Sequence, residues 1–347
     1  MNKEKIKNRR IIAIIIVVAL LILSAGSDLV NMKMNKLKSD ENFIKSQLTS
    51  LTDRGLKEKV ISGKNQAERI LVLRIEGSIQ GSSYMPSGAG YNHVETLRAL
   101  EAAKDDKSIK GIILKVDSPG GTVYHSAELW KKIMDLKEAS DIKIYTSMGT
   151  VAASGGYYIA APSDKIFASE ETTTGSIGVI ADYVNYSGLE EKLGIKHNVI
   201  KSARHKDIGS PSREMTDEER EILSNSVMAS YEKFLDVVSQ GRNIPKDKLR
   251  PIADGRIYDG RQALNNGLID EIGYFEDVVL AMTEDLGLTN PLVYERTNPS
   301  NDYLSNFFGL PLGRMLGERS DLDLIYDIRN IYGENNNHRI LYMYGGF

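Results

Sequence analysis

The chain contains, after an apolar run at residues 142–147, the stretch Val151-Ala152-Ala153-Ser154-Gly155-Gly156-Tyr157-Tyr158. The apolar run predicts a buried strand, and the aromatic-rich residues 157–161 are typical of the start of a buried helix. The two glycines would let a substrate backbone approach closely, and amides at a helix start favour negative charge. A strand, a tight turn and a helix in this order would place the Ser154 hydroxyl at the rim of a sheet, where it could act as a nucleophile.

Ser154 has a second interpretation. Serine is a favoured N-cap residue, so Ser154 could simply cap a packed helix, and spacing alone favours this interpretation. The stretch also departs from the G-x-S-x-G nucleophile elbow, because Ala152 occupies the first glycine position. Other parts of the chain have to decide between nucleophile and cap.

Apolar runs alternate with amphipathic segments on both sides of this stretch. Strands are expected at residues 70–75, 111–116, 142–147, 165–168, 177–180 and 196–200. Helices are expected at 93–104, around 127–136, from Thr216, where Glu219 completes a capping box, and at 278–286. A short strand, a helix and another strand are expected between residues 255 and 273. The alternation predicts an α/β domain with a mostly parallel sheet.

Composition fits a folded protein and excludes several kinds of function. The 347 residues are 41% hydrophobic and 26% charged, which is ordinary for globular domains. The net charge of −3 provides no strong positive field, so no nucleic-acid partner is expected. The absence of cysteine excludes thiol nucleophiles, disulfides and zinc–thiolate sites and fits an exported protein. We expect neither a cofactor nor a metal.

The amino terminus predicts a membrane location. Five basic residues between Lys3 and Arg10 precede an unbroken apolar run at residues 11–23. By the positive-inside rule, residues 1–30 are predicted to be a cytoplasmic basic segment and a single-pass anchor in the cell membrane, with the rest of the chain extracytoplasmic. The alternative is a secretory segment cleaved at Ala25-Gly26-Ser27.

Three further regions follow the anchor. Residues 31–66 are lysine-rich and polar and are predicted to be a stalk or linker. Residues 67–290 are predicted to be the catalytic domain, and residues 291–347 a C-terminal extension. The extension ends in an apolar run, residues 340–347, after a polar spacer at 334–338. This end is expected to be a substrate-like peptide in a groove, an added edge strand, or a disordered end.

A serine nucleophile needs a group that takes its proton. None of the five histidines, His93, His125, His197, His205 and His338, lies in a setting that demands a catalytic role. A lysine can serve if burial or nearby cations keep it neutral, at a cost of about 3 to 5 kcal/mol of lost charge stabilisation. Cations are crowded at residues 201–211, which could equally be a solvated basic loop.

Two turns offer further groups for such a site. Backbone amides at Gly120-Gly121 could stabilise an oxyanion, a contribution of about 3 to 4 kcal/mol per donor, or they could belong to an ordinary turn. The polar turn Thr172-Thr173-Thr174-Gly175-Ser176 precedes an expected strand and could equally have no further role.

Taken together, these motifs resemble a known family. The order and spacing of Asp117-Ser118-Pro119-Gly120-Gly121, Ala152-Ala153-Ser154-Gly155-Gly156-Tyr157-Tyr158, Thr174-Gly175-Ser176-Ile177-Gly178-Val179 and Lys206 ahead of Pro211 are similar to those of the signal peptide peptidase A family, peptidase family S49. Tyr91-Asn92-His93, residues 210–216 and residues 254–261 extend the similarity, which covers about residues 68–285. The single-length chain resembles the short, Gram-positive-type form.

The resemblance implies a ClpP/crotonase-like fold of repeated ββα units and a Ser-Lys serine endopeptidase. It implies that Ser154 is the nucleophile and Lys206 the general base. It also implies that Gly121 is a main-chain oxyanion donor and that the Ser176 hydroxyl orients the lysine. Lys201 is a rival base that fits the family pattern less well.

The resemblance also implies partners. In single-length relatives the serine and the lysine of one site come from neighbouring subunits, so a ring-like homo-oligomer is expected. The expected substrates are remnant signal peptides released by signal peptidase, together with other unfolded or apolar peptides. The alternatives are a histidine-dependent ClpP-like protease, acyl-CoA chemistry on the same fold, and a non-catalytic membrane scaffold.

Overall fold

The computed structural model describes residues 57–81, 91–297 and 341–343. Within these ranges the chain is a mixed α/β structure with one nine-stranded and one two-stranded sheet. The strands are β1 (Lys57–Ser62), β2 (Asn65–Glu76), β3 (Ile109–Ser118), β4 (Gly120–Thr122), β5 (Lys143–Ala153), β6 (Lys165–Ala168), β7 (Thr173–Gly175), β8 (Ile257–Tyr258), β9 (Glu271–Ile272), β10 (Pro291–Thr297) and β11 (Leu341–Met343). The helices are α3 (His93–Asp105), α4 (Val123–Ala139), α5 (Gly155–Ala160), α6 (Ser187–Lys192), α7 (Asp217–Arg242), α8 (Lys246–Leu249), η1 (Arg250–Ile252), α9 (Gly260–Asn265) and α10 (Phe275–Asp285).

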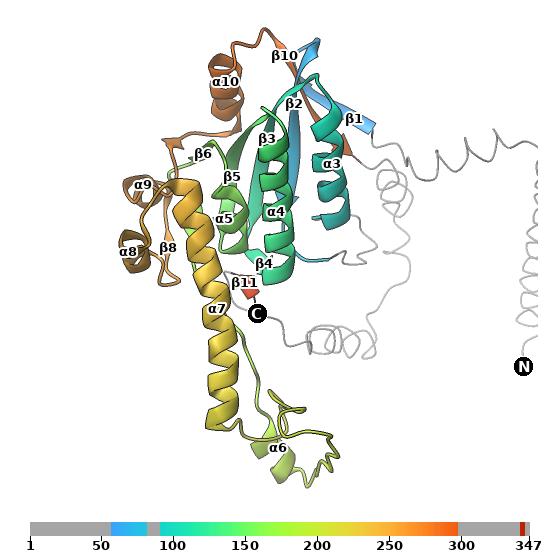
Figure 1. The fold of residues 1–347 in the computed structure, drawn as a ribbon, viewed down its shortest axis with the longest axis vertical. Coiled ribbons are helices and arrows are strands. Elements are labelled where there is room, and N and C mark those ends of the chain that lie inside the picture. The colour runs from blue at the N-terminus through green and yellow to red at the C-terminus, as the bar shows by residue number, and fades with distance from the viewer. Residues whose placement is uncertain (1–56, 82–90, 298–340, 344–347) are drawn as a thin grey trace, which may run out of the picture. The chain divides into compact units, whose positions relative to one another are not determined.

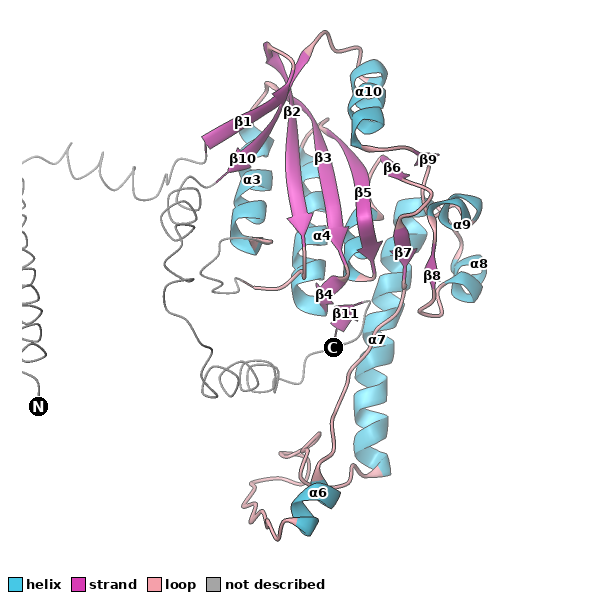
Figure 2. Cartoon of the chain, turned by 180° about the vertical axis from the view of Figure 1, so that it is seen from behind, coloured by secondary structure: helices cyan, strands magenta, loops and turns pink. Residues whose placement is uncertain are grey.

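The main sheet is mostly parallel, which confirms the α/β class expected from the alternating runs. Its strand order is β1-β10-β2-β3-β5-β6-β9, and β7 pairs with both β5 and β8. Strands β2, β3, β5 and β6 are parallel neighbours, whereas β1–β10 and β7–β8 are antiparallel. Helices α3, α4 and α5 cover one face of the sheet, and α10 lies on the other face (Figures 1 and 2).

The central strands are buried on both faces, because successive side chains point to opposite sides of a sheet. Leu71 and Ile75 of β2 belong to the larger core under the helices. Ile70 and Val72 of the same strand belong to a second core that contains Val278 of α10. A fully buried side chain of this kind contributes about 1.5 to 3 kcal/mol, so these two cores fix the sheet that carries the candidate site.

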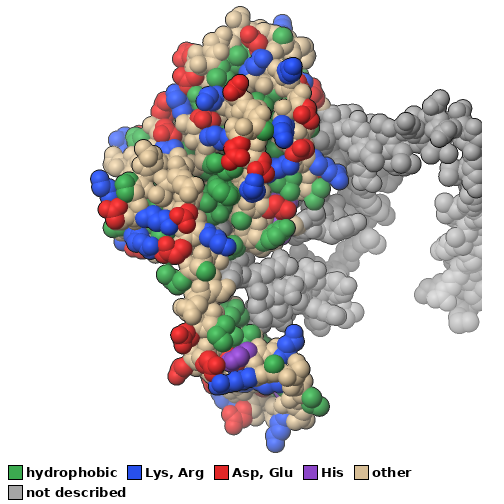
Figure 3. Space-filling view, in the orientation of Figure 1, with side chains coloured by type: hydrophobic (Ala, Val, Ile, Leu, Met, Phe, Trp, Pro, Cys, Tyr) green, Lys and Arg blue, Asp and Glu red, His purple; other side chains and the backbone are tan. Residues whose placement is uncertain are grey.

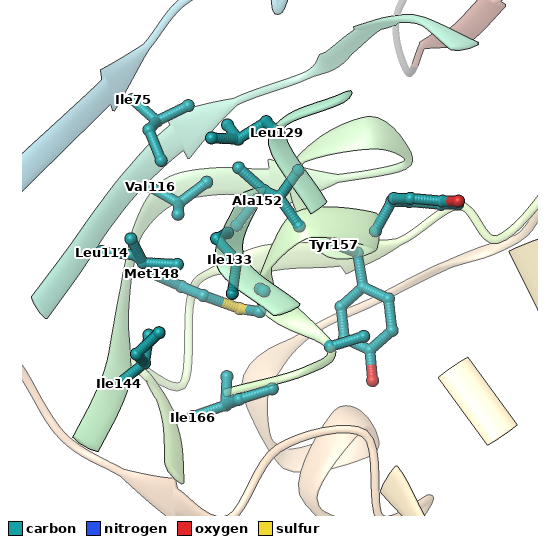
Figure 4. Close-up of a cluster of buried hydrophobic side chains, with 14 of the residues drawn as sticks. Ile75, Leu114, Val116, Leu129, Ile133, Ile144, Met148, Ala152, Tyr157 and Ile166 are labelled. Atoms are coloured by element: carbon teal, nitrogen blue, oxygen red, sulfur yellow. The ribbon is translucent and has the colours of Figure 1, made fainter. Parts of the chain in front are cut away.

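Helix α5 is embedded in the larger core. Tyr157 of α5 is fully buried beside Ile133, Ile166 and other apolar side chains of this cluster (Figure 4). Its hydroxyl donates a hydrogen bond of 2.7 Å to the Leu268 carbonyl oxygen, so the phenol is satisfied although it is buried. The position of the residues just before α5 is therefore well determined by packing.

The sheet extends beyond both boundaries predicted for the catalytic domain. Strand β1 lies in the predicted stalk and pairs with β10, which lies in the predicted C-terminal extension. Strand β10 pairs in turn with β2 and so joins the main sheet. The sequence did not indicate β1 because the strand is polar and exposed, as edge strands often are.

Two expected strands are not strands in the structure. At residues 177–180 the left-handed backbone of Ser176, with φ of 48°, turns the chain away from β5. Residues 196–200 have no regular structure, and their apolar side chains Val199 and Ile200 are exposed. The predictions were wrong because apolar runs of this length also occur where no partner strand is present.

Residues 177–216, called the arm below, start at the sheet after β7, run beside α7 and contain α6, which lies near the N-terminal end of α7 (Figures 1 and 2). The C-terminal part of α7 packs into the core through Phe234, Leu235 and Val238, whereas its first turns extend beyond the sheet. The predicted capping box at Thr216 and Glu219 is present.

The predicted membrane anchor lies outside the residues that the structure describes. Within the described ranges, none of the helices combines the length and the apolar character that crossing a membrane requires.

Candidate active site

Ser154 lies in the sharp turn between β5 and α5. Its backbone has φ of 53° and ψ of −116°, a conformation that costs a non-glycine residue about 1 to 3 kcal/mol. Hydrogen bonds hold it there: the Ser154 amide donates to the Gly175 carbonyl, and the Tyr158 amide donates to the Ser154 carbonyl, each at 2.8 Å. A strained serine between a strand and a helix matches the nucleophile interpretation.

The Ser154 side chain does not cap α5. It accepts no hydrogen bond from the first turn of the helix, so the N-cap interpretation is wrong. The residue is 1% exposed, and Oγ has no hydrogen-bond partner within the described part of the chain. A buried unpartnered hydroxyl costs about 1 to 3 kcal/mol, and such a cost is typical of a group that meets its partner only during function.

The Gly121 amide faces the edge of the short strand β4 that lies away from Ile79. On one side of β4, the Ile79 amide donates to Gly120 at 2.7 Å and the Thr122 amide donates to Ile79 at 2.9 Å. Because hydrogen-bonding groups alternate along a strand, the Gly121 amide points to the opposite side. Strand β11 lies on that side and pairs antiparallel with β4, with Tyr342 opposite Gly121.

Ser118 holds β4 beside the turn that contains Ser154. It is fully buried, and its hydroxyl donates to Gly77 at 2.6 Å and accepts from the Gly120 amide at 3.1 Å. Ser118 is in register with Ala152 of β5, and a side chain at Gly156 would lie 2.8 Å from the Ser118 carbonyl oxygen. Sequence reasoning noted the motif around Ser118 but did not assign this role to its hydroxyl.

The structure brings Ser176 to the strand end that carries Ser154. Gly175 is in register with Ala153, so Ser154 and Ser176 follow neighbouring positions of the sheet. Ser176 is 8% exposed, and its amide donates to the Arg256 carbonyl at 2.8 Å. Its left-handed backbone makes it, like Ser154, a strained non-glycine residue.

Lys206 is exposed, and within the described residues its ammonium group makes no hydrogen bond or ion pair. Its neighbours Arg204 and His205 contact Glu218 in the first turn of α7, at 2.6 and 3.3 Å. Helix α7 packs against α5 through its C-terminal part, which includes Phe234, whose ring lies 5.0 Å from that of Tyr158. Glu218 and Phe234 are 16 residues apart, and a helix rises about 1.5 Å per residue, so about 24 Å of α7 separates them. Within one copy of the chain, Lys206 and Ser154 are not brought together.

The rival base Lys201 is engaged elsewhere. Its ammonium group forms an ion pair of 2.6 Å with Asp207. Among the described histidines, none donates to or accepts from Ser154 Oγ. His338 lies outside the described residues.

Two tyrosines close to Ser154 are unsuitable as bases. Burial raises the pKa of the Tyr158 hydroxyl to about 12, and the nearby Asp236 adds to this rise. Burial also raises the pKa of Tyr157. Both phenols therefore keep their protons near neutral pH, which leaves Ser154 without a proton acceptor from its own helix.

Comparison with known proteins agrees with this geometry. The family model for peptidase family S49 matches residues 137–289. An Enterococcus faecium protein named "Putative signal peptide peptidase SppA" is 38% identical over 97% of this chain and 99% of its own length. Protease 4 of Haemophilus influenzae is 32% identical over 67% of this chain and 36% of its own length. The chloroplastic serine protease SPPA of Arabidopsis thaliana is 32% identical over 63% of this chain and 32% of its own length.

Proposed function

This chain belongs to peptidase family S49 and is a serine endopeptidase, and from that premise we propose that it is a membrane-anchored Ser-Lys enzyme that degrades signal peptides. The observation that carries the proposal is the strained turn at Ser154, whose buried hydroxyl has no partner within the described residues. The mixed α/β structure with its central sheet also fits a ClpP/crotonase-like fold, which forms part of the proposal.

In the proposed reaction, Ser154 Oγ attacks the scissile carbonyl carbon of the peptide. The neutral amine of Lys206 takes the hydroxyl proton and later gives it to the leaving amine of the substrate. The Gly121 amide donates to the oxygen that becomes negatively charged in the tetrahedral intermediate. Water then attacks the acyl-enzyme, with Lys206 again taking a proton, and restores the Ser154 hydroxyl. Ser176 is proposed to orient the lysine.

The lysine of one site is proposed to come from a neighbouring copy of the chain. The separation along α7 makes contact within one copy unfavourable, whereas the exposed position of Lys206 leaves it accessible to another copy. The arm also exposes apolar side chains: Leu193 is 65% exposed and Ile200 is fully exposed. Figure 3 shows hydrophobic and basic side chains beside each other on this face of the arm. An apolar surface of this kind supports assembly with a second copy.

Substrates are proposed to bind as an added strand on β4. The pairing of β11 with β4 supports this mode, because an extended segment already fits the edge to which the Gly121 amide points. Main-chain pairing needs no particular side chain, so it suits peptides of varied sequence such as remnant signal peptides and other unfolded or apolar peptides.

The proposed location is the cell membrane. Residues 1–30 would form a single-pass anchor with a cytoplasmic amino terminus, because basic residues precede the apolar run. The catalytic domain would then lie outside the cytoplasm, close to the bilayer in which signal peptides remain after their release.

The test compares peptidase activity of the wild type with Ser154→Ala, Lys206→Ala and His205→Ala variants in the assembled protein. The proposal expects the first two variants to be inactive and His205→Ala to keep most of its activity. If Lys206→Ala keeps near-normal activity and His205→Ala abolishes it, the Ser-Lys mechanism is wrong and a histidine-dependent protease takes its place.

A further inference from the structure

One arginine of the arm, Arg213, makes an unusually complete set of contacts. Its guanidinium group donates to both carboxylate oxygens of Asp207 and to the Asp207 main-chain carbonyl, each at 3.0 Å. It also donates to both carboxylate oxygens of Glu219, at 2.8 and 2.5 Å, and to the Glu214 carbonyl at 3.0 Å. All three nitrogen atoms of the guanidinium group are therefore used as donors.

The partners of Arg213 belong to two different elements. Asp207 directly follows Lys206 in the turn of the arm, whereas Glu219 lies in the first turn of α7. The Glu219 side chain is 3% exposed and also accepts from the Thr216 amide at 3.0 Å, as part of the capping box. Arg213 thus joins the residue beside Lys206 to the capping box that begins α7.

The chemistry of the contact requires arginine. A planar guanidinium group can bind two carboxylates with paired hydrogen bonds, whereas an ammonium group acts as a compact point charge. The hydrogen bonds from Arg213 are the largest cause of the lowered pKa values of Asp207 and Glu219, so both carboxylates stay charged at neutral pH. Lys201 provides a second cation for Asp207 but does not contact α7 through that bond.

We propose that Arg213 is a positioning residue for the reaction, which fixes the turn carrying Lys206 to the start of α7 and so sets where the base is presented. This inference rests on the proposed function, because it takes Lys206 as the base. The Lys206 side chain makes no hydrogen bond or ion pair within the described residues, so its position depends on the backbone of this turn. Displacing a catalytic group by about 1 Å can lower the rate about a hundredfold.

The experiment measures kcat and KM for a peptide substrate with the assembled full-length protein and its Arg213→Ala and Arg213→Lys variants. The matched control is Arg250→Ala. Arg250 forms a comparable paired contact with Glu232 of the same helix, at 2.8 Å for both bonds, but far from the arm. The rate of labelling of Ser154 by a fluorophosphonate is measured in parallel, and the assembly state of every variant is checked.

For Arg213→Ala the inference expects kcat to fall about a hundredfold while KM changes by less than about threefold. The labelling rate of Ser154 should fall in parallel. Added guanidinium at millimolar concentration should raise kcat of Arg213→Ala and leave Lys206→Ala inactive. Arg213→Lys should also have a strongly lowered kcat, because its single ammonium group cannot make the paired hydrogen bonds to both carboxylates. If Arg213→Ala does not assemble, the inference is tested with Arg213→Lys instead.

Two results would overturn the inference. Activity of Arg213→Ala equal to that of Arg250→Ala would exclude a positioning role, and so would a loss explained by failed assembly in both Arg213 variants. The proposed function is tested separately by Lys206→Ala. If that variant is inactive while Arg213→Ala is fully active, the Ser-Lys mechanism stands and only the role of Arg213 is wrong.

Discussion

The substitution Gly121→Ala tests the proposed oxyanion donor by moving β4 without removing any polar group. A methyl group at this position would lie 2.0 Å from the Ile79 carbonyl oxygen and 2.6 Å from the Ile79 nitrogen. Both are main-chain atoms, so no side-chain rotation can relieve the contact. Ordinary contact begins at 3.4 Å, so β4 has to move by at least about 1 Å.

The size of the effect follows from this displacement. Moving β4 breaks or lengthens the two hydrogen bonds that join it to Ile79, and overpacking of this kind costs about 1 to 3 kcal/mol. For a domain of this size, that corresponds to a fall in Tm of about 2 to 12 °C. Loss of one oxyanion donor lowers kcat about a hundredfold to a thousandfold, so activity should fall far more than stability.

The assay compares kcat/KM and Tm of wild type, Gly121→Ala and the control Gly188→Ala. Gly188 lies in α6, and a methyl group added to it would have no neighbouring atom within 4 Å, so its substitution should leave both quantities nearly unchanged. The reasoning is refuted if Gly121→Ala has a lowered Tm but keeps kcat/KM within a few fold of the wild type. That outcome would mean that the Gly121 amide does not stabilise the oxyanion.

Three further predictions concern the tail, the arm and the start of α7. Truncation after Glu334 should raise activity towards a short peptide, because it removes β11 from the edge of β4. As a tethered segment, β11 competes with the substrate at an effective concentration of about millimolar. Unchanged activity would mean that β11 does not occlude the site. Lys201→Gln should keep kcat within about threefold of the wild type, because Lys201 only pairs with Asp207; a loss as large as that of Lys206→Ala would make Lys201 the base. The pKa of Glu219 is lowered to about 2, chiefly by the hydrogen bond from Arg213, so its charge contributes stability that is complete above about pH 5 and is lost towards pH 2. The Tm difference between wild type and Glu219→Gln should therefore narrow as pH falls from 5 to 2, and a constant difference would contradict this account.

The central part of the fold could be predicted because its sequence signals are local. The runs at 70–75, 111–116 and 142–147 are buried strands in the structure, and the box of Thr216 and Glu219 does begin a helix. The turn at Ser154 was also predictable, because a small-residue stretch between a buried strand and a buried helix leaves few other arrangements. The comparisons confirm the family, whereas the roles of Lys206, Gly121 and Ser176 stay predictions.

Other features depend on contacts between distant segments and could not be predicted. The polar strand β1 exists because β10 pairs with it, and β11 is a strand because β4 offers an edge. The contacts of Arg213 join a loop to a helix start, and its sequence position alone gave no signal for them. The apolar residues at 196–200 were expected to form a strand because a short apolar run in the sequence does not show whether it pairs in a sheet or lies exposed on a loop.

The most direct test of the central claim mixes Ser154→Ala protein with Lys206→Ala protein under conditions that exchange subunits. Each variant alone should be inactive. If the serine and the lysine of one site come from neighbouring copies, about a quarter of the sites in a random equal mixture will hold both groups, and activity should return to about a quarter of the wild-type value. An inactive mixture, with exchange of subunits demonstrated, would contradict a shared site.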